Sequence, residues 1–167
     1  DENISWGVNT KVHHVDFNIT RQEKIHRILK PWYFEHGFLP KLHVCPNRKY
    51  SHNCCECEKC CRTIIGLLIE DIDPRDCGFP CFDQQVLLQI KGHLISGKFT
   101  SNENKMFFWR DIQRNINLVK INKNDTIKEF LTWFLSFKLH KQNKPNFIQK
   151  IYNKFRKIIE IIILSLR

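Results

Sequence analysis

The chain has 167 residues, of which 42% are hydrophobic and 12% aromatic, and this composition is enough to bury one sizeable core. No stretch reaches the roughly 18 consecutive apolar residues of a membrane-spanning helix. The formal net charge of +10 comes entirely from the C-terminal part, because residues 1–97 hold 12 Lys or Arg and 12 Asp or Glu, whereas residues 98–167 hold 15 and 5.

The first predicted helix begins after Thr20. Thr20 followed three residues later by Glu23 is a capping box, and Ile25 and its apolar neighbours supply a face to bury. We expect the helix to stop at Pro31, since proline has no amide hydrogen to donate. Residues 38–44 are the best strand candidate, and this strand would lead directly into the first ligand of a cysteine cluster.

Four cysteines in the spacing C-x8-C-x2-C-x2-C dominate the sequence. They are Cys45, Cys54, Cys57 and Cys60. Four soft thiolates at this spacing predict a closed tetrahedral site for Zn²⁺ with a structural role. Free thiols or disulfides are the alternative, but a disulfide framework needs an oxidising compartment and no secretory signal is visible. We therefore expect a cytoplasmic location. His43 and His52 flank the cluster, and four cysteines already complete the coordination.

The other four cysteines are expected to be structural. Cys55 and Cys61 directly follow ligands and are predicted to be small buried hydrophobes. Cys77 and Cys81 lack the spacing of a standard metal-binding pair, and a second metal contact is the alternative for them. The polar residues 46–53, between the first two ligands, predict a flexible surface loop.

Further helices are predicted along the rest of the chain. One begins at Glu58 and has the last of the four cysteines at its N-terminus. There the free backbone amides and the helix dipole favour the thiolate form of a cysteine. A second is capped by Asp83, a third spans residues 106–116, and a fourth is capped by Thr126 with Glu129.

The basic part of the chain, residues 98–167, is predicted to be an appended helical region that follows a boundary near residue 97. Within it, residues 148–166 place apolar side chains at helical spacing, and most of the lysines lie off that stripe. A packing helix with a solvated basic side is the favoured interpretation. A membrane-surface helix and a nucleic-acid-binding arm are the alternatives.

Four cations are the best candidates for contacts with a phosphate or an acidic substrate. They are Arg21, Lys24, Lys59 and Arg62. The first two lie at the start of the first helix and the other two within the cysteine cluster, so the fold is able to bring them together. The alternative for each is an ordinary surface charge.

The cysteine pattern resembles the zinc motif of 7-cyano-7-deazaguanine synthase and its relatives among the N-type ATP pyrophosphatases. Residues 53–63 read NCCECEKCCRT and are closest to uncharacterised members that read NCGxCEKCxRT. Residues 20–25, 66–68 and 73–79 are also similar to the segments around the motif in this group. The resemblance covers about residues 1–80 and is absent after residue 97.

This resemblance implies the C-terminal part of a Rossmann-like domain of the adenine nucleotide hydrolase type, an α/β remnant that is predominantly helical here. It favours Arg21 and Arg62 as nucleotide or substrate contacts. The family's ATP chemistry needs a Ser-Gly-Gly-x-Asp-Ser loop, and none of the six glycines of this chain adjoins another. We therefore expect the C-terminal portion of a longer enzyme, whose partner is a separate nucleotide-binding region or subunit and which is not catalytic alone.

The function implied by the resemblance is ATP-dependent ligation, in which an adenylate forms and a nitrogen nucleophile displaces AMP. ATP would be the cofactor of the complete enzyme, and zinc would have no part in bond making. The alternative function is a zinc-knuckle module that binds nucleic acid or another protein. A homodimer is also possible.

Overall fold

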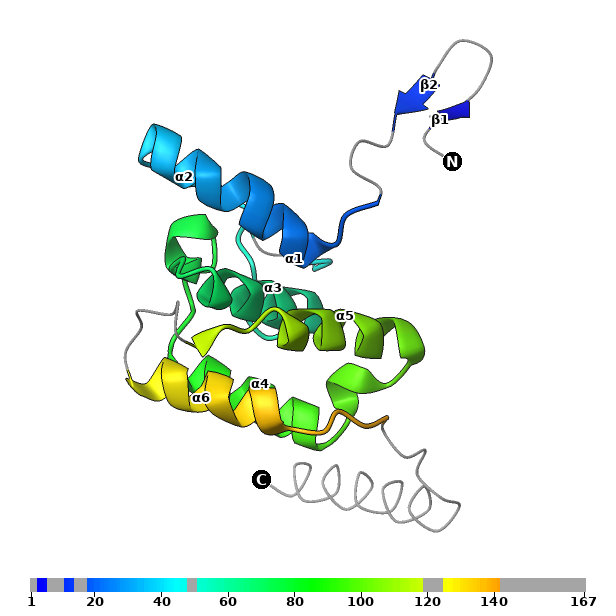
Figure 1. Cartoon of the computed structure of the whole chain (residues 1–167), viewed down its shortest axis with the longest axis vertical. Coiled ribbons are helices and arrows are strands. Elements are labelled where there is room, and N and C mark those ends of the chain that lie inside the picture. The colour runs from blue at the N-terminus through cyan, green and yellow to red at the C-terminus, as the bar shows by residue number, and fades with distance from the viewer. Residues whose placement is uncertain (1–2, 6–10, 14–17, 48–50, 119–124, 142–167) are drawn as a thin grey trace, which may run out of the picture.

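The computed structural model describes residues 3–5, 11–13, 18–47, 51–118 and 125–141, and these residues are predominantly helical (Figure 1). Within these ranges the only sheet is an antiparallel pair, in which β1 (Asn3–Ser5) runs beside β2 (Lys11–His13). The prediction of a mainly helical chain is therefore confirmed, whereas the Rossmann-like part of it stays a prediction. No helix among the described residues is long and apolar enough to cross a membrane.

Three segments form one long helix at the edge of the molecule. They are α1 (Arg21–Lys24), the π-helix η1 (Ile25–Leu29) and α2 (Lys30–His36). The predicted capping box is present, because the hydroxyl of Thr20 accepts a hydrogen bond from the amide of Glu23 at 3.2 Å. The Glu23 carboxylate in turn accepts from the amide of Thr20 at 2.7 Å.

The prediction that this helix stops at Pro31 is wrong. An α-helix would press the proline ring against the carbonyl one turn earlier, but the π-helical turn just before Pro31 is wider and relieves that contact. The helix continues to His36. It ends there because Gly37 adopts a left-handed conformation, with a φ of 71°.

The remaining helices follow the predicted order, but the last one begins at Asp125, so Thr126 lies inside this helix and does not cap it as predicted. They are α3 (Glu58–Ile69), α4 (Gln84–Ile95), α5 (Glu103–Arg114) and α6 (Asp125–Ser136), with short 3-10 turns at η2 (Pro74–Cys77) and η3 (Lys98–Thr100). Asp83 caps α4 as expected, since its carboxylate accepts from the amide of Val86 at 3.0 Å. The amphipathic segment predicted at residues 148–166 lies outside the described residues.

Helix α3 occupies the centre of the fold, between the long helix on one side and α4, α5 and α6 on the other (Figure 1). Every residue of α3 from Cys60 to Ile69 is buried. The hydrophobic core around it also contains Trp109 and Phe134, whose rings meet edge to face at 5.8 Å. Residues on both sides of the predicted boundary at residue 97 therefore belong to the same core.

Hydrogen bonds to the buried carboxylate of Glu70, at the end of α3, attach the long helix to α3. Glu70 accepts hydrogen bonds from Gln22 at 3.4 Å and Lys30 at 3.3 Å, and it lies 2.9 Å from Nδ1 of His26. Gln22 also donates to the carbonyl of Gly66 at 3.2 Å. A Cβ on Gly66 would lie only 2.6 Å from the Gln22 side-chain oxygen, so the Gln22 side chain would have to move from its present position if this residue were larger.

The strand predicted at residues 38–44 is absent, and the chain here is irregular. Its backbone groups already have other partners. The amide of Leu42 donates to the carbonyl of Cys77 at 2.9 Å, and the carbonyl of Leu42 accepts from the side chain of Asn53 at 2.7 Å. A neighbouring strand would have needed these same groups.

We predict that Gly78→Ala lowers the free energy of unfolding by about 1–3 kcal/mol, because Gly78 has a φ of +92° and a Cβ there would meet the Leu42 carbonyl oxygen at 2.9 Å. The matched control is Gly92→Ala within α4, where a Cβ would meet no atom within 4 Å. That variant should gain about 0.5–1 kcal/mol. Urea unfolding curves measure both, and an unchanged midpoint for Gly78→Ala would contradict the assignment of strain.

Candidate metal centre

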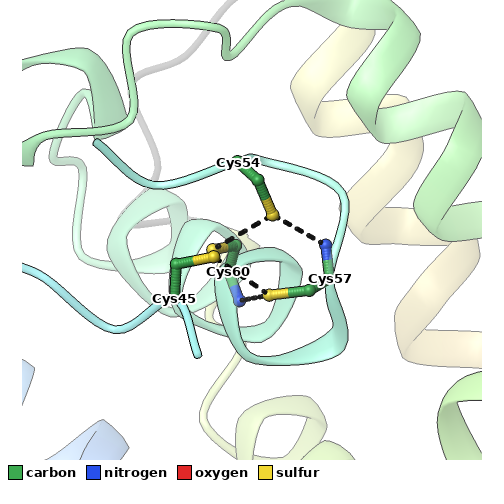
Figure 2. A group of neighbouring side chains, drawn as sticks. All are labelled: Cys45, Cys54, Cys57 and Cys60. Atoms are coloured by element: carbon green, nitrogen blue, oxygen red, sulfur yellow. Dashed lines mark hydrogen bonds between the residues drawn. The ribbon is translucent and has the colours of Figure 1, made fainter. Parts of the chain in front are cut away.

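The four predicted ligands converge at the start of α3 (Figure 2). Their sulfur atoms all lie within 4.8 Å of one another. Cys45 Sγ is 4.0 Å from Cys57 Sγ, and Cys54 Sγ is 3.9 Å from Cys60 Sγ. Four sulfurs bound to tetrahedral zinc at about 2.3 Å would be about 3.8 Å apart, so the cluster has the size of an S₄ metal site.

Residues 54–60, which we call the knuckle, direct backbone amide hydrogens at two of these sulfur atoms. The amide of Cys57 donates to Cys54 Sγ at 3.3 Å, and the amide of Cys60 donates to Cys57 Sγ at 3.5 Å. Cys57 is at the same time the N-cap of α3, so the positive end of the helix dipole faces the cluster. These features stabilise negative charge on sulfur, as the sequence predicted for ligands at a helix entrance.

The cysteine thiols differ in how readily they ionise. Burial opposes ionisation of Cys45, yet hydrogen bonds from the backbone of Cys54 and Asn47 lower its pKa to about 7. Burial raises the pKa of Cys57 and also that of Cys60, where the neighbouring thiols Cys57 and Cys54 add to the effect. Four thiolates this close repel one another, and a divalent cation at their centre is what would allow all four to ionise together.

Asn53 organises the cluster, although the sequence predicted it to lie in a flexible surface loop. Its side chain is fully buried. The side-chain oxygen accepts from the amides of Val44 at 2.9 Å and Cys45 at 3.1 Å, and the side-chain nitrogen donates to the carbonyls of Leu42 at 2.7 Å and Gly78 at 2.8 Å. Asn53 therefore fixes the position of Cys45 relative to the knuckle. Its place next to Cys54 was the only sequence signal of this role.

The other four cysteines do not belong to the group of sulfur atoms that could hold a metal ion. Cys55, Cys61 and Cys77 are buried, which confirms the prediction that Cys55 and Cys61 act as small core residues, while Cys81 is exposed. Cys55 has a positive φ of 58°, which turns the chain between two ligands. Its thiol donates to the carbonyl of Asn53 at 3.7 Å, and the thiol of Cys61 donates to the carbonyl of Cys55 at 3.4 Å.

The predicted anion contacts occupy two environments. Arg21 and Lys24 line an apolar cavity of about 250 Å³ between the long helix and residues 42–44, where Arg21 donates to the hydroxyl of Thr63 at 3.1 Å. Arg62 is buried, pairs with Glu58 at 3.5 Å, and lies over the ring of Phe108 at 4.1 Å.

Lys59, the fourth candidate cation, is exposed on the first turn of α3. Arg21 also lines a small cavity together with Arg62, and the charge of Arg21 contributes to lowering the pKa of Arg62, although burial is the main cause. The structure therefore brings Arg21 and Arg62 close together. Their role as phosphate contacts stays a prediction.

We predict that Asn53→Asp weakens zinc binding at least about tenfold and lowers the free energy of unfolding by about 2–4 kcal/mol. An aspartate has the same shape, but it cannot donate to the carbonyls of Leu42 and Gly78, and it adds negative charge beside the thiolates. Competition with a zinc chelator measures the affinity. Asn104→Asp, at an exposed position of α5, serves as the control. Equal zinc affinity in both variants would show that Asn53 does not position the ligands.

Comparison of the chain with protein-family models, with curated proteins and with solved structures finds no match. The assignment of function therefore depends on the geometry of the cysteine cluster.

Proposed function

We propose that the chain binds one Zn²⁺ through Cys45, Cys54, Cys57 and Cys60, and that this zinc is structural. The observation that carries the proposal is the convergence of four sulfur atoms within 4.8 Å, with backbone amides directed at two of them. Four thiolates fill the coordination shell of zinc and leave no position for water or substrate. The metal would hold the protein together and would take no part in bond making.

The bound zinc would join two parts of the chain. Cys45 belongs to the irregular segment before the knuckle, whereas Cys57 and Cys60 belong to the start of α3. Asn53, the turn at Gly78 and the backbone of Cys54 already attach that segment to the knuckle through the hydrogen bonds described above. Zinc coordination would convert this attachment into a rigid one.

We further propose that this zinc-bearing unit belongs to an ATP-dependent, adenylate-forming enzyme of the ATP pyrophosphatase type and that it acts with a separate nucleotide-binding region or subunit. The sequence around the knuckle supports this proposal, as does the proximity of Arg21 to Arg62. The alternative of a nucleic-acid-binding knuckle is less well supported. The exposed Glu56 lies between two of the ligands, and its negative charge opposes a phosphate backbone.

We predict that Cys57→Ser loses most of the bound zinc and lowers the free energy of unfolding by about 3 kcal/mol or more, because metal binding and folding are coupled in structural zinc sites. The matched control is Cys81→Ser, which removes an exposed thiol outside the cluster. Elemental analysis and urea unfolding are measured on both variants. A Cys57→Ser protein with unchanged zinc content and midpoint would refute the structural role.

The need for a separate nucleotide-binding region is tested by ATP–pyrophosphate exchange, which reports reversible adenylate formation. We expect the zinc-loaded chain alone to give no exchange above the background without protein, in the presence of Mg²⁺ and candidate carboxylate substrates. Exchange catalysed by this chain alone, and abolished in an Arg21→Gln variant, would contradict the requirement for a partner.

A further inference from the structure

The cavity between the long helix and residues 42–44 is walled mainly by aliphatic side chains. Its volume is about 250 Å³. The aliphatic residues that line it are Ile25, Ile28, Leu29, Leu42 and Val44. Ile25 and Leu29 are buried, whereas Ile28 is 48% exposed. An apolar hollow of this size on the surface indicates a site for a small apolar group.

The backbone of residues 42–44, which forms one wall of the cavity, is already hydrogen-bonded. The amide of Leu42 donates to the carbonyl of Cys77, and the carbonyl of Leu42 accepts from Asn53. The amide of Val44 donates to the side-chain oxygen of Asn53. None of the described residues that line the cavity is aromatic. A heterocyclic base would leave polar edge atoms without partners on this wall, whereas an aliphatic chain has no such atoms.

Two cations lie at one end of the cavity. Arg21 and Lys24 belong to α1, whereas Ile28 and Leu29 lie farther along the long helix, in η1. Arg21 donates through Nη1 to the hydroxyl of Thr63 at 3.1 Å, and its other nitrogens have no partner among the described residues. Lys24 likewise forms no ion pair with a described residue, and none of the described lining residues is acidic. These two charges are complementary to a ligand with an anionic end.

A carboxylate suits these two cations better than a phosphate does. The planar fork of the Arg21 guanidinium matches the two oxygens of a carboxylate, and the Lys24 ammonium adds a point charge. Phosphate sites usually add backbone amides directed at the ligand, but the amides of Leu42 and Val44 are already bonded. Arg62, the third cation predicted to contact a phosphate, does not line this cavity.

We propose that this cavity binds an aliphatic carboxylate of medium length, with its carboxylate at Arg21 and Lys24 and its chain along the aliphatic wall. A volume of about 250 Å³ holds roughly eight groups of the size of a water molecule, so a chain of about eight carbons would fill it. Binding of this acid is a property of the cavity alone and requires neither the zinc nor the ATP chemistry proposed above.

Isothermal titration calorimetry of octanoate into the purified chain tests this proposal. We expect a dissociation constant of about 10–100 µM, an ordinary affinity for a ligand of this size. Butanoate should bind at least about 30-fold more weakly, because each buried methylene contributes about threefold. Octanol, which has the same chain and no charge, should bind at least about tenfold more weakly than octanoate.

Two variants test the two ends of the cavity. Lys24→Gln should weaken octanoate binding about tenfold by removing a charge-assisted contact. Ile28→Asp should weaken it at least about tenfold, because it places a carboxylate beside the aliphatic chain. The matched controls are Lys138→Gln and Leu88→Asp, which make the same changes at exposed positions outside the cavity and should leave the dissociation constant unchanged. Circular dichroism reports whether each variant is folded.

The proposal would be overturned if octanoate did not bind, or if it bound equally well to the wild-type and Lys24→Gln chains. Inorganic phosphate that displaces octanoate at equal concentration would overturn it too, since the cations would then form a phosphate site. An affinity that keeps rising at the same rate from octanoate to dodecanoate would show that the cavity does not enclose the chain. The titrations contain no ATP and leave the four cysteines unchanged, so none of these results would affect the zinc proposal or the adenylate proposal.

Discussion

The rest of this structure depends on four cysteine sulfur atoms that lie within 4.8 Å of one another and that would repel one another as thiolates. Burial keeps Cys57 and Cys60 protonated in the absence of a cation, whereas hydrogen bonds already favour the thiolate of Cys45. A divalent metal would remove this conflict by neutralising charge at the centre of the cluster. The free energy of metal binding would then become part of the free energy of folding.

The hydrogen bonds of Asn53 connect this cluster to the fold. They set the distance between Cys45 and the start of α3, and they also satisfy backbone groups that a strand would otherwise pair. Helix α3 continues from the cluster into the core, and Gln22 and Glu70 attach the long helix to its far end. A change at the metal centre should therefore be transmitted through α3 to the long helix.

The features that the sequence predicted correctly are local ones. The capping box at Thr20 and the cap at Asp83 each depend on residues three positions apart, and the four cysteines all fall within residues 45–60. The errors depend on contacts that distant residues make. Pro31 is accommodated by a π-helical turn, Cys77 and Asn53 take the backbone amide and carbonyl of Leu42, and Asn53 is buried with its side chain bonded to backbone groups. None of these contacts leaves a periodic pattern in the sequence.

The most direct test of the account is X-ray absorption at the zinc edge of the purified chain. We expect a single shell of four sulfur atoms at about 2.3 Å, with one zinc per chain. A shell with fewer than four sulfurs, with nitrogen or oxygen in their place, would open the coordination sphere and contradict a purely structural metal. A chain that retains no zinc and folds equally well without it would contradict the central claim itself.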